Sequence, residues 1–283
     1  MTAETNLKPL PVDLVLPPRP QAMMALVEEM RRDEPDLKRV ATAIQSDPGL
    51  AGAMLKVVNS PSFGLARKAT SVSQALGILG LRNISNIASG VALRQSMNQS
   101  AQGMERFWDT AEKVALICAE LARRLRGIPH DEAYTVGLFH DCGIPLLMQR
   151  HPNYREVLAL ANNGGGTSFQ AVEEEQIGTH HCAVGYFIAR SWHLPETISQ
   201  AILWHHHPDA FNASAGLAGP VRNFIALLHF AEHIHHTRMR SQQDAEWSRF
   251  GEAVLAHFAL TDEDFLTLMD TVNDALSESD AAP

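Results

Sequence analysis

Apolar residues recur at spacings of three and four along most of the chain, which is the period of an amphipathic helix. Between positions 23 and 30, methionine, leucine and valine recur in this way around polar Glu28 and Glu29. No segment shows the sustained period-two alternation that is typical of a half-buried strand, and no stretch of the sequence repeats. The pattern therefore predicts an all-α fold, built as a multi-helix bundle.

Capping residues and helix breakers divide this pattern into segments. Asp36 precedes one amphipathic run and Asp47-Pro48 opens the next; aspartate is a favoured N-cap, and proline fits the first helical turn. Five prolines among the first 20 residues predict an extended start, and Gly80 is a breaker. A polar stretch at 98–103 is the best candidate for an internal boundary. We expect helices near residues 21–30, 36–45, 48–58, 71–82, 84–93, 107–126, 131–148 (bent at 143–145), 154–162, 169–191, 196–206, 221–237 and 262–276.

The composition is that of an acidic globular protein. Of the 283 residues, 45% are hydrophobic and 19% are charged, which argues against a disordered chain. With 23 basic and 32 acidic side chains the net charge is −9, so neither DNA nor an anionic membrane is an expected partner. The three cysteines contain no CxxC pair and are expected to be buried thiols rather than redox sensors. No secretory leader or membrane span is recognisable, so we expect a cytoplasmic protein.

Histidine is the residue type that points to chemistry. Most of the 14 histidines lie between His130 and His236. Because an imidazole binds metals and exchanges protons near neutral pH, we expect the functional site in this half of the chain. The histidines fall in four stretches, at 140–141, 178–185, 205–208 and 229–236, and part of the last stretch is expected to be a solvated helix face.

Each stretch has a structural explanation beside the functional one. Adjacent His140 and Asp141 can give one nitrogen and one oxygen to the same ion, a mixture that suits manganese, iron or zinc. Alternatively, they hydrogen-bond to each other in the core. His181 lies four residues before Gly185, so a second backbone can approach closely beside the ring. Imidazoles at 205–207 would also suit the C-terminal end of a helix dipole.

The order of these motifs resembles the HD superfamily of metal-dependent phosphohydrolases, whose ligands follow the sequence His, His-Asp, His, His, Asp on successive helices. More closely, the chain resembles the HDOD family, the HD-related output domain of bacterial signalling, over roughly residues 15–215. The resemblance implies an all-α fold of two helical subdomains. It rests on LPPRP (16–20), IQSDPGL (44–50), KVVNS (56–60), FG (63–64), SVSQALGILGLR (71–82), FW (107–108), GLFHD (137–141), GTHH (178–181), WHLP (192–195) and AILWHHHP (201–208).

This resemblance divides the chain into four parts. Residues 1–14 are an extended N-terminal tail, and residues 15–100 are the N-terminal helical subdomain of HDOD. Residues 101–215 are the HD-like helical subdomain, which carries the histidine motifs. Residues 216–283 are expected to be a C-terminal helical extension that ends in a polar tail.

Several positions depart from the pattern of catalytic HD enzymes. Their first histidine follows an aromatic pair in a long helix, where this chain has Phe107-Trp108 and then Thr110. The lysine that commonly follows HDxG is missing, because the chain continues from Asp141 as Cys-Gly-Ile-Pro. Glu232 stands at the final aspartate position. The Gly-Tyr-Pro motif of cyclic-di-GMP phosphodiesterases is absent, since the chain reads Asp-Ala-Phe-Asn at 209–212.

The resemblance and its departures imply either no metal or a single weakly held divalent metal: iron, manganese or zinc. The candidate ligands are His140 and Asp141, the remnants of a catalytic pair, together with His181, His205, His206 and Glu232. Glu175 or Glu232 would accept hydrogen bonds from the ring nitrogens. The alternative is a metal-free polar network in which these side chains satisfy one another and hold the helices in register.

We expect a non-catalytic bacterial signal-transduction output module, a stand-alone HDOD protein that binds a signalling protein or a nucleotide second messenger. A missing ligand harms a two-metal centre more than it harms folding, which is why catalysis is not the first choice. The alternative is a metal-dependent phosphohydrolase that acts on a nucleotide or phosphodiester with a reduced ligand set. The partner surface is expected in the first half of the chain, with Arg67, Lys68 and Arg82 as exposed candidates. The sequence indicates no oligomeric state.

Overall fold

Helices are the regular elements of the computed structural model, which describes residues 14–98, 104–163, 168–239 and 245–280 and has no strand among them. The all-α prediction is confirmed. Residues 99–103 of the expected internal boundary lie outside the described part. The elements are α1 (Gln21–Met30), α2 (Leu37–Gln45), α3 (Pro48–Val58), η2 (Pro61–Phe63), α4 (Val72–Asn98), α5 (Glu105–Ala122), α6 (His130–Phe139), α7 (Gly143–Arg150), α8 (Tyr154–Asn163), α9 (Phe169–Ile177), α10 (His181–Ser191), α11 (Glu196–Trp204), η3 (Ala213–Ala215), α12 (Gly219–Met239), α13 (Ala245–Phe258) and α14 (Asp262–Asp280).

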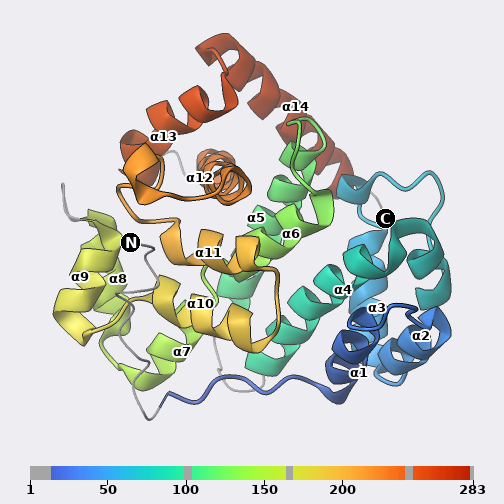
Figure 1. Cartoon of the computed structure of the whole chain (residues 1–283). Coiled ribbons are helices and arrows are strands. Elements are labelled where there is room, and N and C mark those ends of the chain that lie inside the picture. Colours follow the sequence, from blue (N-terminus) through green and yellow to red (C-terminus); the bar gives the residue numbers. More distant parts are fainter. Residues whose placement is uncertain (1–13, 99–103, 164–167, 240–244, 281–283) are drawn as a thin grey trace.

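The N-terminal helices α1 to α4 form one group beside the central pair α5 and α6 (Figure 1). Asp36 caps α2 by accepting hydrogen bonds from the backbone N–H groups of Lys38 and Arg39, and Asp47 caps α3 in the same way. Both caps were predicted from the sequence. Gly80 has a φ of 79°, which a residue with a Cβ rarely adopts, and it divides α4 at a kink. The predicted break at this glycine is confirmed.

The second half is built around α5 and α6, which pack so closely that only glycine fits between them. A Cβ on Gly137 would lie 2.6 Å from the Cα of Ala115. Helices α7 to α11 lie on the side of this pair away from α1 to α4, and α12 crosses above them (Figure 1). One continuous hydrophobic core joins the two halves, with Trp108 and Phe139 among its fully buried side chains.

Two of the predicted helices are broken where the sequence pattern suggested continuity. The expected helix at 131–148 is two helices, α6 and α7, and the break precedes the expected bend at 143–145. Pro145 therefore lies in the first turn of α7, where its missing N–H is harmless. The expected helix at 169–191 is also two helices, because Gly178 ends α9 with a φ of 76°. His180 then caps α10 by accepting a hydrogen bond from the backbone of Ala183.

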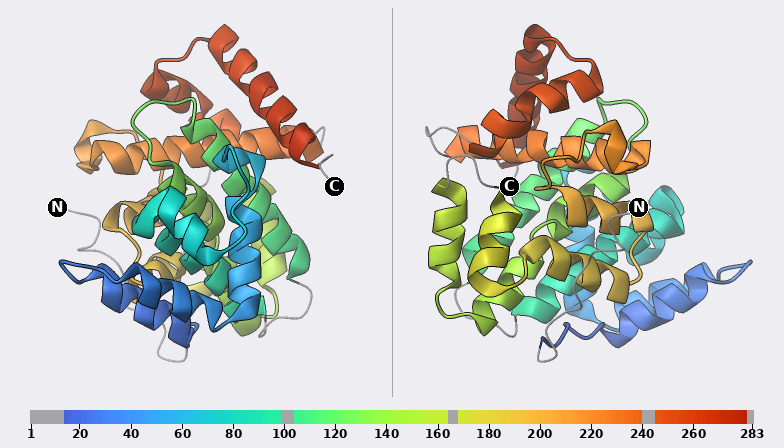
Figure 2. Two further views of the ribbon diagram at one scale, coloured as in Figure 1. Left: turned by 90° about the vertical axis from the view of Figure 1, so that its right-hand side faces the viewer. Right: turned by 60° about the vertical axis from the view of Figure 1, so that its left-hand side comes forward.

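The C-terminal extension consists of α12, α13 and α14. Figure 2 shows α13 and α14 as a hairpin that covers one side of α12. α13 packs on α12, whereas α14 contacts α5 and the η2 turn of the N-terminal half. The extension therefore reaches both halves of the molecule.

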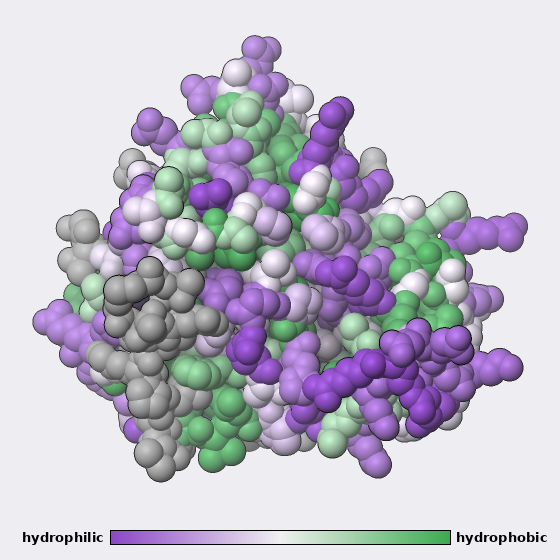
Figure 3. All heavy atoms as spheres, in the orientation of Figure 1, coloured by the Kyte–Doolittle hydropathy of each residue, from purple (hydrophilic) through white to green (hydrophobic). Residues whose placement is uncertain are grey.

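The surface carries two features that bear on the expectations from the sequence. Hydrophilic side chains gather over α1 and α2 in the lower right of Figure 3. Arg67, Lys68 and Arg82 are exposed, and Arg82 also forms an ion pair with buried Glu132. Among the described helices, the stretch Val72–Met97 is long and apolar enough to cross a membrane, but 61% of its apolar window is buried in the core. This stretch packs as the core helix α4.

Candidate functional site

The candidate ligands come together where four segments of the second half meet. These segments are the junction of α6 and α7, the first turn of α10, the C-terminal end of α11 and the middle of α12. The four histidines are buried and the two carboxylates are half-buried. The residues are His140, Asp141, His181, His205, His206 and Glu232.

Helix ends orient two of the four rings. His140 follows the last residue of α6 and His205 follows the last residue of α11. Each ring turns back, so that its Nδ1 lies 2.7 Å from the carbonyl oxygen three residues earlier, that of Gly137 or Ile202. Because a carbonyl oxygen can only accept, Nδ1 donates its hydrogen and Nε2 of the neutral ring keeps a lone pair.

Carboxylates orient the other two rings. Nδ1 of His181 lies 2.7 Å from Oε2 of Glu173 in α9, and Nδ1 of His206 lies 2.7 Å from Oε2 of Glu246 in α13. An ionised carboxylate also only accepts, so these Nδ1 atoms donate as well. All four rings are thereby held with Nε2 available to the interior of the site.

Of the two acceptors expected from the sequence, Glu232 lies 3.4 Å from Nε2 of His140, but Glu175 orients no ring. Glu175 is exposed, whereas Glu173 is fully buried against His181 and also accepts a hydrogen bond from the hydroxyl of Tyr154. Two residues correspond to about 200° of rotation around a helix, so only one of these glutamates can face the site. Three glutamates in a row at 173–175 give no sequence signal that selects the right one.

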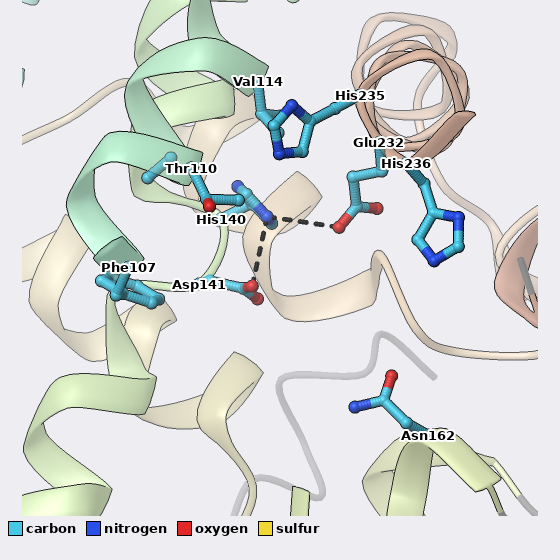
Figure 4. A pocket seen from close by; sticks show the side chains of 10 residues that line it. Phe107, Thr110, Val114, His140, Asp141, Asn162, Glu232, His235 and His236 are labelled. Atoms are coloured by element: carbon cyan, nitrogen blue, oxygen red, sulfur yellow. Dashed lines mark ion pairs between the residues drawn. The ribbon is translucent and has the colours of Figure 1, made fainter. Parts of the chain in front are cut away.

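Asp141 is the carboxylate on which the Nε2 atoms converge. Its Oδ1 lies 3.3 Å from Nε2 of His181 and 3.6 Å from Nε2 of His205. Its Oδ2 lies 3.3 Å from Nε2 of His140, and that nitrogen is also 3.4 Å from Oε1 of Glu232 (Figure 4). Asp141 therefore stands between His140 on one side and the other histidines on the opposite side.

The ligands accordingly form two groups that share Asp141. In each group the candidate ligand atoms lie within 4.8 Å of one another. The structure thus separates His140 from the three other histidines, although the sequence had placed all of them in a single set. The four-ligand group consists of Asp141, His181, His205 and His206, and the three-ligand group consists of His140, Asp141 and Glu232.

The four-ligand group fits a divalent metal ion. Among the described residues, Oδ1 of Asp141 and Nε2 of His205 are buried and have no hydrogen-bond partner. A carboxylate oxygen that faces imidazole lone pairs is repelled unless a cation, either a proton or a metal, lies between them. Three nitrogens and one carboxylate are ligands that zinc, iron and manganese accept, and four ligands suit the tetrahedral preference of zinc.

The electrostatics show the same need for a cation. Burial lowers the pKa of His140, but the carboxylates of Asp141 and Glu232 outweigh it and raise this pKa well above its ordinary value. For His181, burial is likewise outweighed by Cys182, Glu173 and Asp141, so its pKa is also raised. His140 and His181 therefore hold a second ring proton wherever no metal replaces it.

A cavity of about 490 Å³ opens onto the three-ligand group (Figure 4). Thr110, which stands at the expected position of the lost first histidine, lines this cavity together with Phe107. His235 and His236 line it from α12. A smaller cavity of about 210 Å³ reaches the four-ligand group beside His206.

The expectation that part of residues 229–236 forms a solvated face is met only in part, because α13 packs over this part of α12: His229 is buried, whereas His233, His235 and His236 are half-buried. None of the histidines in the stretch is exposed. His229 stacks on Phe250 with ring centroids 4.2 Å apart, and His233 stacks on Trp247 at 4.3 Å. No separate helix was predicted at residues 245–258, which form α13, and no role was assigned to them.

The cysteines are buried free thiols, as expected. Sγ of Cys182 lies 3.3 Å from Nε2 of His181, at the edge of the four-ligand group. Burial raises the pKa of this thiol, but the imidazoles of His181 and His205 outweigh burial and lower the pKa well below its usual value.

Comparisons with known proteins agree on the fold. An "Uncharacterized protein" of Treponema pallidum (strain Nichols) is 22% identical over 194 residues, which are 68% of this chain and only 38% of that relative. A "Putative phosphohydrolase" from Shewanella amazonensis SB2B is 22% identical, with a TM-score of 0.69 over 93% of this chain and 92% of that one. A "Putative signal transduction protein" from Marinobacter aquaeolei VT8 is 20% identical, with a TM-score of 0.65 over 98% of this chain and 61% of that one.

The family match covers both helical groups and most of the site. Residues 16–208 match the family described as the HDOD domain, a range that includes five of the six candidate ligands and ends two residues after His206. Glu232 lies beyond it, in the C-terminal extension. Since the match spans more than half of the sequence, this chain belongs to the HDOD domain family.

Proposed function

We propose that the chain is a signal-transduction module that holds one divalent metal ion and does not hydrolyse phosphodiesters. The proposal rests on the different number of imidazole nitrogens in the two ligand groups. The four-ligand group offers three imidazole nitrogens, whereas the three-ligand group offers one nitrogen and has Thr110 nearby in place of a further imidazole. A neutral hydroxyl is a poor substitute for imidazole as a ligand of transition metals.

His181, His205, His206 and Asp141 would hold the ion. These residues come from α10, the end of α11 and the junction of α6 and α7, so the ion would join three segments of the chain. When bound, the metal supplies positive charge and can polarise a ligand oxygen at the cavity. The chain itself contributes rings that are already oriented by acceptors at Nδ1, which removes the need to reorder them on binding.

Signal transmission would then depend on a second molecule. The 490 Å³ cavity is lined by several polar side chains, including His236, Asn162 and Glu232, and has room for a small polar ligand. A nucleotide second messenger fits this description, and a protein partner could instead bind the exposed basic residues Arg67 and Lys68 of the N-terminal half. Either binding event would be read out as a change in the packing of the helices that the ion joins.

Metal analysis combined with an activity assay tests the proposal. Protein purified with manganese, iron or zinc should contain one ion per chain, and His181→Ala should lose it. The loaded protein should show no turnover of bis(p-nitrophenyl) phosphate or of cyclic dinucleotides. A metal content of zero in every condition, or turnover that His140→Ala abolishes while the fold remains intact, would overturn the proposal.

One observation favours a second candidate, a metal-dependent phosphohydrolase with a reduced ligand set. Asp141 is shared by the two ligand groups and lines both of the cavities that reach them, and a pair of ions joined by a carboxylate is a common arrangement for phosphate ester hydrolysis. This candidate requires two ions per chain. Metal stoichiometry therefore distinguishes the two functions before any substrate is known.

A further inference from the structure

Glu246 reaches the site from a part of the chain that the family match does not include. The match ends at residue 208, whereas Glu246 lies in the first turn of α13. Its Oε2 is 2.7 Å from Nδ1 of His206, 40 residues away in sequence. The C-terminal extension thus touches a candidate ligand directly.

We propose that Glu246 is a positioning residue for the four-ligand group, because it fixes the tautomer and the ring orientation in which His206 presents Nε2 to the ion. The inference rests on the proposed function in so far as an ion is bound, but the tautomer itself does not depend on the ion. The C-terminal extension thereby has a role in the site, because α13 supplies the acceptor for Nδ1 of His206 that residues 16–208 do not contain.

The ring of His206 is constrained from its edge and from its face. Glu246 is itself held, since its Oε1 lies 2.9 Å from Nη1 of Arg249, one turn further along α13. Phe169 stacks on the His206 ring with centroids 4.8 Å apart and planes only 8° from parallel. Unlike His140 and His205, whose Nδ1 atoms bond to carbonyls of their own helices, His206 depends on a residue from another element.

α13 is docked on α12 by contacts that do not involve Glu246. Phe250 stacks on His229, Trp247 stacks on His233, and Val254 is completely buried. Removing the Glu246 carboxylate therefore leaves the helix in place. A variant at this position therefore changes the orientation of the His206 ring without unfolding the C-terminal extension.

The bond also links ion binding to the docking of α13. If Glu246 favours the ring orientation that binds the ion, then the bound ion must favour the position of α13 by the same free energy. Ion binding should consequently protect the amides of residues 245–258 from hydrogen exchange. Loss of the carboxylate should remove this extra protection and leave the basal protection of the helix unchanged.

The test compares the full-length wild type with Glu246→Ala and with Glu252→Ala, a matched control at an exposed position of the same helix. Zinc affinity is measured by competition with a chromophoric chelator, and the His206 tautomer by ¹⁵N NMR of histidine-labelled protein without metal. We expect Glu246→Ala to weaken zinc binding about 10–100-fold, the usual effect of losing a group that orients a ligand. It should also replace the pure Nδ1–H tautomer of His206 by a mixture, whereas Glu252→Ala should match the wild type in both assays.

The outcomes separate this inference from the proposed function. Equal zinc affinity and an unchanged His206 tautomer in Glu246→Ala would overturn the inference and leave the metal site standing. A wild type that binds no zinc would overturn the metal site. In that case the tautomer measurement alone decides the role of Glu246, and an Nδ1–H form that is lost in Glu246→Ala would support it.

Discussion

Replacing Gly143 by alanine tests how the fold brings the halves of the site together. Gly143 begins α7, two residues after Asp141, and packs against the first turn of α10. A Cβ on Gly143 would lie 2.1 Å from the carbonyl oxygen of His181 and 3.0 Å from the backbone nitrogen of Gly185. The sequence predicted a close backbone approach at Gly185, but a Cβ there would meet the side chain of Ile202 at 2.9 Å, and the close backbone contact is made by Gly143 instead.

The expected cost follows from this geometry. Real Cβ atoms essentially never approach another atom closer than 3.0 Å, so α7 and α10 must separate by about 0.9 Å. Because the obstacle is backbone and not a flexible side chain, the strain should reach about 1–3 kcal/mol or more. The same movement shifts Asp141 relative to His181, whose Oδ1–Nε2 distance is 3.3 Å, and should weaken metal binding.

Urea unfolding of Gly143→Ala and of Gly52→Ala measures this cost against a matched control. Gly52 lies in α3 with no atom within 4 Å of an added Cβ, so alanine there should stabilise the protein by about 1 kcal/mol through helix propensity. The two variants should therefore shift the unfolding midpoint in opposite directions, and only Gly143→Ala should lose zinc affinity. A Gly143→Ala protein as stable as the wild type would refute the close contact between α7 and α10.

Three further predictions concern the site. Thr110→His should raise the metal content measured by mass spectrometry from one to two ions per chain, because it adds an imidazole beside the three-ligand group. An unchanged metal content would mean that Thr110 does not face a second ion. Glu173→Ala should lower the free energy of unfolding in urea by about 1–3 kcal/mol for each of the three buried donors that it leaves without an acceptor, namely the hydroxyl of Tyr154 and the backbone N–H and Nδ1 of His181. An unchanged midpoint would contradict the role of Glu173. In the metal-free protein, burial lowers the pKa of His205, but Cys182 and Asp141 raise it to about 9, above the unfolded value of 6.5. The contribution of protonated His205 to the free energy of unfolding is therefore complete below pH 6.5 and is lost as the pH rises through 9. The urea midpoint should fall over this window in the wild type and fall less in His205→Asn.

Local signals in the sequence predicted most of the fold. Asp36, Asp47 and Gly80 act through their own backbone neighbours, and the structure has two caps and a kink at these positions. The break before α7 was missed because a bend was expected at 143–145 instead, and the break at Gly178 was missed although a glycine that ends a helix is a local signal.

The site required information that no local pattern contains. The sequence identified the histidines and Asp141 through the order of their motifs, yet it placed His140 with His181 because spacing along the chain does not reveal on which side of Asp141 a ring lies. Glu173 and Glu246 escaped notice for a similar reason: each orients a ring across an interface between helices. Tertiary packing alone determines such pairs.

An anomalous-scattering crystal structure of the protein grown with zinc or manganese tests the central claim most directly. We expect one peak per chain, about 2.0–2.2 Å from the Nε2 atoms of His181, His205 and His206 and from a carboxylate oxygen of Asp141. No peak is expected between His140 and Glu232. Two peaks joined by Asp141, or no peak at all, would contradict the claim.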